Sequence, residues 1–284
     1  MDIGFHIANF TWDVPDHQLA PTLARAATEA ETSGIKRITV MDHFWQIRGI
    51  GTPEKPMLEG YTALGFLAAH TKSVLLHTLV TGVIYREPAI LAKQITTLDV
   101  LSGGRAGLGI GAAWNEDESH GLGIPFPPTK ERFERLEEAI QICLQMWSDD
   151  EGPYDGKYYH LGRTLNSPQN LSTPRPYLMI GGVGEQKTLR YVARYADACN
   201  IFGSPEAAHK LDVLRHWCDV EERDYDTIEK TTTTAITPDT DLDEFVGRLD
   251  ELRELGFTAA YVSARRPDPL GAVEFLAQVA ERVA

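Results

Sequence analysis

Residues 19–41 read LAPTLARAATEAETSGIKRITVM and join a helix-like segment to a strand-like one. In Leu19–Thr32 the apolar side chains recur every three to four residues, which is the spacing of one helix face. Gly34 stands where such a helix should end, and Ile35–Met41 is a short, mostly apolar run. The stretch therefore predicts a helix followed by a buried strand.

The same alternation continues along the chain and predicts an α/β fold. Eight strand-like runs in fewer than 300 residues favour a (β/α)8 TIM barrel over an open doubly wound sheet. Most of the runs are almost continuously apolar, as expected for parallel strands that are buried on both faces. The predicted strands are Ile3–Ala8, Ile35–Met41, Val74–Thr81, Arg105–Ile110, Tyr177–Gly181, Ala198–Phe202, Thr231–Ile236 and Ala259–Val262. Further amphipathic helices are predicted at Glu131–Trp147, Asp241–Leu255 and Gly271–Val283.

Two connections are too long to be simple turns. The first runs from Phe44 to Glu59, and the second, from Gly152 to Pro176, is an insertion between strands four and five. Connections of this length in a compact domain are usually functional. The chain shows no internal repeat, so we expect residues 1–284 to form a single TIM-barrel domain.

The composition excludes several classes of protein. The 284 residues carry a formal net charge of −14, which disfavours nucleic acids and anionic membranes as partners. The segment beginning at Met1 has no signal-peptide pattern, and no apolar run is long enough to cross a membrane. Cys143, Cys199 and Cys218 are widely spaced, which is typical of reduced thiols in a cytoplasmic protein.

In a barrel of this kind the ligand site lies at the C-terminal ends of the strands. Those ends carry glycines, amides and aromatic residues but few acids, which suits a large planar ligand and a small-molecule substrate. They are Asn9-Phe10, Asp42–Trp45, Val80–Gly82, Gly111–Asn115, Gly181–Gly184, Asn200–Phe202, Ser263 and Arg265-Arg266.

Two features of these strand ends suggest anion binding and proton transfer. Gly181–Thr188 leaves a strand and opens a helix, so its free N–H groups and Lys187 predict an anion site, although a tight turn also needs such glycines. His43 follows the second strand beside Asp42, an acid that can orient it, and histidine exchanges protons near neutral pH. No converging metal ligands accompany His43, so a metallohydrolase is disfavoured.

Gly107–Ala112 formally matches the dinucleotide pattern G-x-G-x-x-A. Its glycines lie within the predicted strand, and neither the helix opening nor the acid that a Rossmann site requires follows them. We interpret them as positions of close backbone approach to a ligand or of a crowded barrel interior.

Several segments together resemble the bacterial luciferase-like monooxygenase superfamily, and within it the branch that uses coenzyme F420. The resemblance extends from the first strand to about Phe202. The segments that carry it are Val40–Phe44, Leu75–Ala89, Leu98–Arg105, Gly109–Glu116, Glu131–Phe133 and Gly181–Leu189.

The resemblance implies a deazaflavin ring across the C-terminal mouth, close to Asp42 and His43. The ring would lie against a bulge at the end of strand three, where family members often have a non-prolyl cis peptide, here near Leu79-Val80. The phosphate of the cofactor would bind at Gly182–Thr188, and Asn115 would lie near the pyrimidine end. The resemblance also implies a homodimer.

One departure limits the analogy. The sugar-phosphate dehydrogenases of this group carry a catalytic glutamate after strand four, where this chain has Ala112-Ala113-Trp114. We therefore do not transfer their substrate. Trp45 matches only approximately a tryptophan that those enzymes place after the histidine.

The preferred prediction is an oxidoreductase that transfers a hydride between coenzyme F420 and a small organic substrate. The alternatives are an FMN-dependent luciferase-like monooxygenase and a non-catalytic flavin-binding barrel. The predicted catalytic residues are His43, Asp42 and Trp45, and we expect His43→Ala to lower turnover with little effect on the melting temperature. The predicted cofactor-binding residues are Asp42, His43, Leu79, Val80, Thr81, Gly111, Ala112, Asn115, Gly181, Gly182, Val183, Gly184, Glu185, Lys187 and Thr188.

Overall fold

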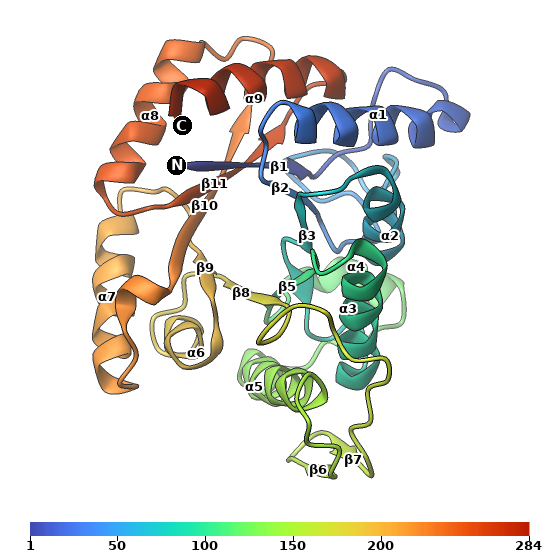
Figure 1. Cartoon of the computed structure of the whole chain (residues 1–284), viewed down its shortest axis with the longest axis vertical. Coiled ribbons are helices and arrows are strands. Elements are labelled where there is room, and N and C mark those ends of the chain that lie inside the picture. Colours follow the sequence, from blue (N-terminus) through green and yellow to red (C-terminus); the bar gives the residue numbers. More distant parts are fainter. Residues whose placement is uncertain (284) are drawn as a thin grey trace.

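A computed structural model describes residues 1–283 and arranges the predicted strands as a nearly closed TIM barrel with helices outside it (Figure 1). All neighbouring strands are parallel, in the order β3-β2-β1-β11-β10-β9-β8-β5-β4. The strands are β1 Asp2–Ile7, β2 Arg37–Val40, β3 Leu75–Thr78, β4 Thr81–Gly82, β5 Gly107–Gly111, β8 Tyr177–Gly181, β9 Ala198–Asn200, β10 Glu229–Ile236 and β11 Ala259–Ala264.

The eight predicted strands are all confirmed, but the third is interrupted. The segment Val74–Thr81 forms β3 and β4, which are separated by Leu79-Val80. An isolated parallel bridge between Leu76 and Ala106 joins β3 to the residue before β5, while β4 pairs with β5 itself. These two contacts close the barrel.

The helices cover the outside of the barrel, as their amphipathic patterns predict. The predicted helix Leu19–Thr32 is confirmed at both ends and buries its apolar face through Leu23, Ala26, Ala27 and Ala30. No helix of residues 1–283 is long and apolar enough to cross a membrane. The helices are α1 Leu19–Thr32, α2 Gly60–His70, α3 Pro88–Ser102, α4 Glu116–Gly121, α5 Thr129–Met146, α6 Thr188–Tyr195, α7 Ala207–Val220, α8 Leu242–Glu254 and α9 Pro269–Val283.

The predicted insertion between β5 and β8 follows α5 and contains a small antiparallel hairpin. Its strands are β6 Tyr154–Asp155 and β7 His160–Leu161 (Figure 1). The rest of the insertion is fixed to the barrel by the buried carboxylate of Asp99, which accepts hydrogen bonds from Leu171 N, Ser172 N and Ser172 Oγ.

Side chains fill the N-terminal half of the barrel. The Arg37 guanidinium donates two hydrogen bonds to Glu229, at 2.6 and 2.7 Å, and lies beside the Tyr177 and Tyr261 hydroxyls. His77 Nε2 lies 2.8 Å from the Tyr261 hydroxyl. This packed layer leaves only the C-terminal end of the barrel for a ligand.

Gly107–Ala112 belongs to this packed interior and not to a dinucleotide loop. Gly107–Gly111 is β5, and the next helix begins only at Glu116. A Cβ atom at Gly109 would overlap the Thr78 carbonyl oxygen. The prediction of a crowded barrel strand is therefore confirmed at Gly109.

Candidate active site

The catalytic histidine predicted at the barrel mouth has a buried acid partner. His43 follows β2, and its Nδ1 lies 2.7 Å from Oε2 of Glu118, which α4 contributes from the loop after β5. Nε2 has no hydrogen-bond partner within residues 1–283, and the Trp114 ring meets the imidazole edge-on at a centroid distance of 5.4 Å. The imidazole is therefore anchored at one nitrogen and free at the other.

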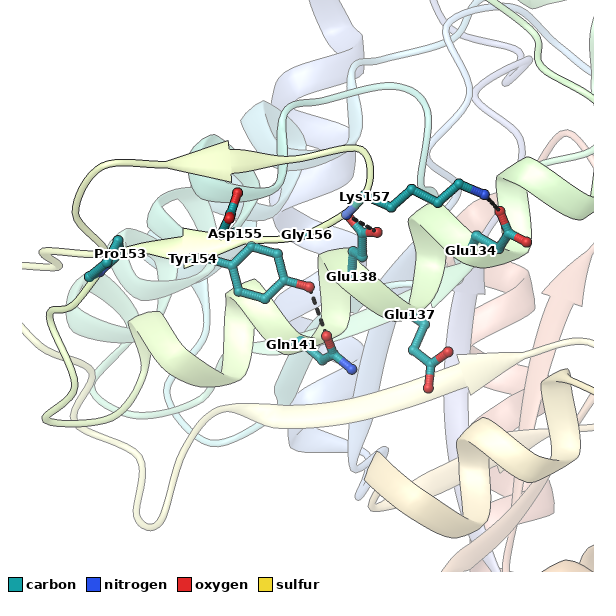
Figure 2. A pocket seen from close by; sticks show the side chains of 9 residues that line it. All are labelled: Glu134, Glu137, Glu138, Gln141, Pro153, Tyr154, Asp155, Gly156 and Lys157. Atoms are coloured by element: carbon teal, nitrogen blue, oxygen red, sulfur yellow. Dashed lines mark hydrogen bonds and ion pairs between the residues drawn. The ribbon is translucent and has the colours of Figure 1, made fainter.

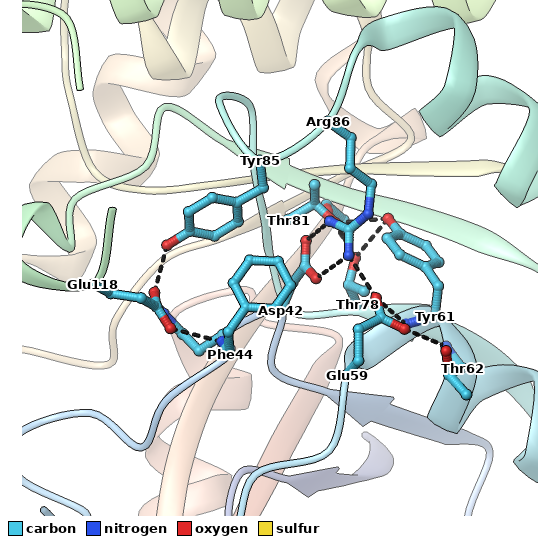
Figure 3. A network of polar contacts seen from close by, with 12 residues as sticks. Asp42, Phe44, Glu59, Tyr61, Thr62, Thr78, Thr81, Tyr85, Arg86 and Glu118 are labelled. Carbon is cyan, nitrogen blue, oxygen red and sulfur yellow. Dashed lines mark hydrogen bonds and ion pairs between the residues drawn. The ribbon is translucent and has the colours of Figure 1, made fainter. Parts of the chain in front are cut away.

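Glu118 is fully buried and is surrounded by hydrogen-bond donors (Figure 3). Oε1 accepts from Phe44 N at 2.6 Å and from Trp45 N at 2.8 Å, and Oε2 accepts from the Tyr85 hydroxyl at 2.7 Å. Burial raises the pKa of Glu118, but hydrogen bonds from His43, Trp45 N and Tyr85 outweigh that effect and hold the pKa below its ordinary value. Glu118 is therefore an ionised carboxylate at neutral pH.

Asp42 does not orient His43, contrary to the sequence-based interpretation. Its two oxygens accept hydrogen bonds from Arg86 at 2.6 and 2.9 Å, and Arg86 also pairs with Glu59 (Figure 3). Burial raises the pKa of Asp42, and the ion pair with Arg86 opposes that shift. The Arg86 guanidinium lies 4.6 Å from the centre of the Tyr61 ring. Asp42 is thus part of a buried ion-pair network behind the mouth.

The bulge between β3 and β4 lies against a wall of glycines. The Leu79-Val80 peptide is cis, as the resemblance implies. A Cβ atom at Gly181 would lie 2.9 Å from Val80 Cγ1, and one at Gly111 would lie 3.2 Å from Val80 Cγ2. Glycine at both positions therefore lets the ends of β5 and β8 pack closely against the Val80 side chain. The predicted cofactor residue Thr81 is buried here, and its hydroxyl lies 2.6 Å from that of Tyr61.

The segment Gly182–Thr188 joins β8 to α6 and presents unused N–H groups. Gly182 N donates to Asn200 O at 3.1 Å, whereas the N–H groups of residues 183–188 have no acceptor within the described part of the chain. The Gly182 φ of +125° is one that residues with side chains rarely adopt. The Lys187 ammonium has no acid partner among residues 1–283 and lies 5.8 Å from the centre of the Phe133 ring. Free N–H groups and an unpaired ammonium at a helix start are the features that the predicted anion site requires.

Other predicted residues have contacts of their own at this end of the barrel. Glu185 binds Lys210 Nζ at 2.5 Å, so its carboxylate does not compete for the anion site. The Asn115 side chain caps α4 and reaches Glu118 Oε2 at 3.4 Å. The Trp45 ring packs tightly against Gly121, and Trp114 is 60% exposed. Trp114 thus precedes α4 in the chain, and Trp45 contacts the last residue of that helix.

Sequence reasoning missed Glu118, Tyr85 and Arg86. Tyr85 and Arg86 lie in the quoted segment Leu75–Ala89, directly before the helix that follows the third strand. Glu118 lies in a helix of six residues, too short to give a periodic signal before the prolines at 125, 127 and 128. Its spacing of three residues from Asn115, which is a helix-capping spacing, is the one local signal for it.

A hollow of about 450 Å³ lies between α5 and the β6–β7 hairpin, away from the mouth (Figure 2). Its polar groups already bind one another. Lys157 Nζ binds Glu134 at 2.8 Å, Lys157 N donates to Glu138 at 2.9 Å, and the Tyr154 hydroxyl donates to Gln141 at 2.7 Å. These contacts hold the hairpin on the helix.

Among residues 1–283, no three His, Cys, Asp or Glu side chains are placed to hold a metal ion.

Comparisons with known proteins show to which family this chain belongs. The F420-dependent glucose-6-phosphate dehydrogenase of Kineococcus radiotolerans is 36% identical over 187 residues, which cover 63% of this chain and 52% of that protein. The chain thus matches about half the length of that relative. The enzyme of the same name from Mycolicibacterium smegmatis is 31% identical over 233 residues, covering 79% of this chain and 67% of that protein.

Solved structures share the fold at low sequence identity. An F420-dependent secondary alcohol dehydrogenase, in complex with an F420-acetone adduct, superposes with a TM-score of 0.85 at 18% identity, over 100% of this chain and 99% of that one. The coenzyme F420-dependent tetrahydromethanopterin reductase of Methanopyrus kandleri gives 0.80 at 18% identity, over 98% of both chains. The family model for luciferase-like monooxygenases matches residues 1–236. This chain therefore belongs to the luciferase-like monooxygenase family.

Proposed function

We propose that this protein is an oxidoreductase that transfers a hydride between coenzyme F420 and a small organic substrate. The observation that carries the proposal is the pairing of His43, with one free ring nitrogen, and a glycine-lined wall at the same barrel mouth. The names of the relatives favour a deazaflavin over FMN.

The chain's own residues fit a planar cofactor with a phosphate-bearing tail. Glycine at 111 and 181 lets the ends of β5 and β8 pack closely against the Val80 side chain, which suits a wall for a planar ring. The N–H groups of residues 183–188 and the Lys187 ammonium suit a phosphate. When bound, the cofactor supplies two-electron hydride chemistry, and the protein supplies orientation and a proton-exchanging group.

The residues around His43 define what the protein would do to a substrate. Nε2 of His43 is the atom that would exchange a proton, and Trp114 and Trp45 would bound the substrate with apolar surface. The loop after β5 has Ala112 and Ala113 where an acid would be needed for the chemistry of sugar-phosphate relatives. We therefore propose a substrate without a sugar phosphate.

Equilibrium binding to the apo-protein tests the cofactor. Titration followed by fluorescence should give micromolar or tighter binding of F420 and at least about tenfold weaker binding of FMN, a difference of about 1.4 kcal/mol. Equal or tighter binding of FMN would replace the proposal with an FMN-dependent monooxygenase. Binding without turnover of any alcohol or carbonyl compound would favour a non-catalytic flavin-binding barrel.

We further propose a homodimer in the cytoplasm. Ile90 and Leu101 on α3 are 58% and 72% exposed, which supports a contact between two copies of this helix. The three buried, unpaired cysteines suit a reducing compartment. Light scattering should give about twice the chain mass of 31.5 kDa, and a mass of one chain would contradict the dimer.

A further inference from the structure

We infer that Glu118 is the positioning residue that fixes the tautomer of His43, with the proton on Nδ1 and a free electron pair on Nε2. The role of that electron pair in turnover rests on the proposed function, whereas the tautomer itself does not. Nε2 of His43 is then the atom that takes the substrate's proton, and Glu118 keeps Nε2 able to do so.

Oε1 of Glu118 can only accept hydrogen bonds. Both contacts of Oε1 are with backbone N–H groups, those of Phe44 and Trp45, and these groups can only donate. A carboxyl proton on Oε1 would point at one of them. Oε1 is therefore an acceptor, whichever groups bind to Oε2.

Oε2 of Glu118 lies within hydrogen-bond distance of Tyr85 and His43. Burial and the neighbouring carboxylate raise the pKa of Tyr85, so its hydroxyl keeps its proton and donates it to Oε2 at 2.7 Å. The Asn115 amide nitrogen, another donor, approaches Oε2 at 3.4 Å. An ionised Oε2 accepts from all of these groups, so the nitrogen of His43 that faces it must carry a proton.

The proton on Nδ1 determines what Nε2 of His43 can do. When Nδ1 carries the proton, Nε2 of the neutral ring has a free electron pair, and Nε2 has no protein partner within residues 1–283. When a substrate hydroxyl gives up its proton, the O–H bond breaks and an N–H bond forms at Nε2. The resulting imidazolium lies 2.7 Å from the buried Glu118 carboxylate, which balances its charge. A base oriented by a third group is the arrangement of catalytic triads.

Glu118 is the one acid of residues 1–283 that contacts the His43 ring. Asp42 is the neighbour of His43 in sequence, but Arg86 binds both of its oxygens. Asp117 lies on the same helix as Glu118, with a side chain that is 82% exposed and directed to Arg48. The contrast between adjacent acids supplies a matched control.

The variant Glu118→Gln tests the inference because it replaces one oxygen by a donor of similar shape. The two backbone N–H groups should retain the amide oxygen, so the NH2 group would face His43 Nδ1. Nδ1 must then accept, and the ring proton moves to Nε2. ¹⁵N NMR of the apo-protein, with the ring nitrogens labelled, should show protonated Nδ1 in the wild type and protonated Nε2 in Glu118→Gln. Turnover should fall roughly 10²–10⁴-fold, as expected for a base in the wrong tautomer.

Asp117→Asn makes the same chemical change on the exposed side of α4 and should keep both the Nδ1–H tautomer and the wild-type turnover. The wild-type spectrum needs no variant, so an unprotonated Nδ1 there would overturn the inference even if Glu118→Gln failed to fold. An unchanged tautomer in folded Glu118→Gln would also overturn it. Failure of the wild type to bind F420 would instead contradict the proposed function and leave the tautomer standing.

Discussion

At the scale of single residues, the contact between His43 and Glu118 changes what a histidine deletion should do. His43→Ala removes the free Nε2, so turnover per folded molecule should fall by about 10²–10⁴. It also removes a donor from a buried carboxylate, which we expect to cost about 1–3 kcal/mol of unfolding free energy. From the structure we therefore expect a lower melting temperature for this variant, in place of the near-wild-type value expected from the sequence.

Ser172→Ala is the matched control for this prediction. The Ser172 hydroxyl also donates to a buried carboxylate, that of Asp99, far from the mouth. The Ser172→Ala variant should lose about as much stability as His43→Ala and keep its turnover per folded molecule. Urea denaturation and turnover measured on the same preparations separate the two effects. His43 would not be catalytic if both variants kept their activity.

The partner of His43 shows why the site was only half predictable. His43 was predictable because a histidine at the end of a buried strand needs only local sequence to be placed at the barrel mouth. Its partner is 75 residues away in sequence and reaches it only after the barrel has closed. Asp42 was chosen for its adjacency, but successive residues at a strand end point in different directions, and Arg86 lies on the side of Asp42.

At the scale of elements, the turn from β8 into α6 can be tested without altering a charge. In Gly182→Ala a side chain must adopt a φ of +125°, which should lower stability by about 1–3 kcal/mol or shift the loop. Because the N–H groups of residues 183–188 point from this loop, we expect F420 to bind at least about tenfold more weakly, about 1.4 kcal/mol.

Gly256→Ala provides the control for the glycine conformation itself. Gly256 follows α8 with a φ of +103° and has nothing within 4 Å of its missing Cβ atom. Its backbone penalty should be similar, and its affinity for F420 should equal that of the wild type. If the two alanine variants bound F420 equally well, the loop after β8 would not hold the cofactor.

Elements with a strong period were the most predictable ones. Helix α1 agrees with its sequence pattern at both ends because an apolar face every three to four residues has only one way to be buried on a barrel. The β6–β7 hairpin has only two residues in each strand, and tertiary contacts with Glu134 and Glu138 hold it in place. Such an element carries too little local pattern to be read from sequence.

At the scale of the whole molecule, two buried histidines should make the barrel sensitive to mild acid. Burial lowers the pKa of His77 to about 3, with repulsion from Arg37 adding to the effect, and burial lowers the pKa of His6 to about 4. Both have ordinary values of 6.5 in the unfolded chain. His77 Nδ1 lies 2.9 Å from the Thr78 carbonyl oxygen, and His6 Nδ1 lies 2.9 Å from Thr39 Oγ1, so each neutral ring is held inside the barrel.

The unfolded chain binds more protons than the folded chain in mild acid, and this difference sets the sign of the pH dependence. Below pH 6.5 the unfolded chain protonates both rings, while the folded chain keeps them neutral down to about pH 4. The free energy of unfolding should therefore fall as the pH is lowered from 6.5 to 4.5, with a slope of about two protons.

His77→Asn keeps a donor for the Thr78 carbonyl and should reduce that slope to about one proton, although it starts from a lower stability at pH 7. The exposed His70, changed to Asn, should leave the slope unchanged. Urea denaturation at intervals across this range measures the slopes, and equal slopes for His77→Asn and the wild type would show that the ring at the centre of the barrel does not control its acid stability.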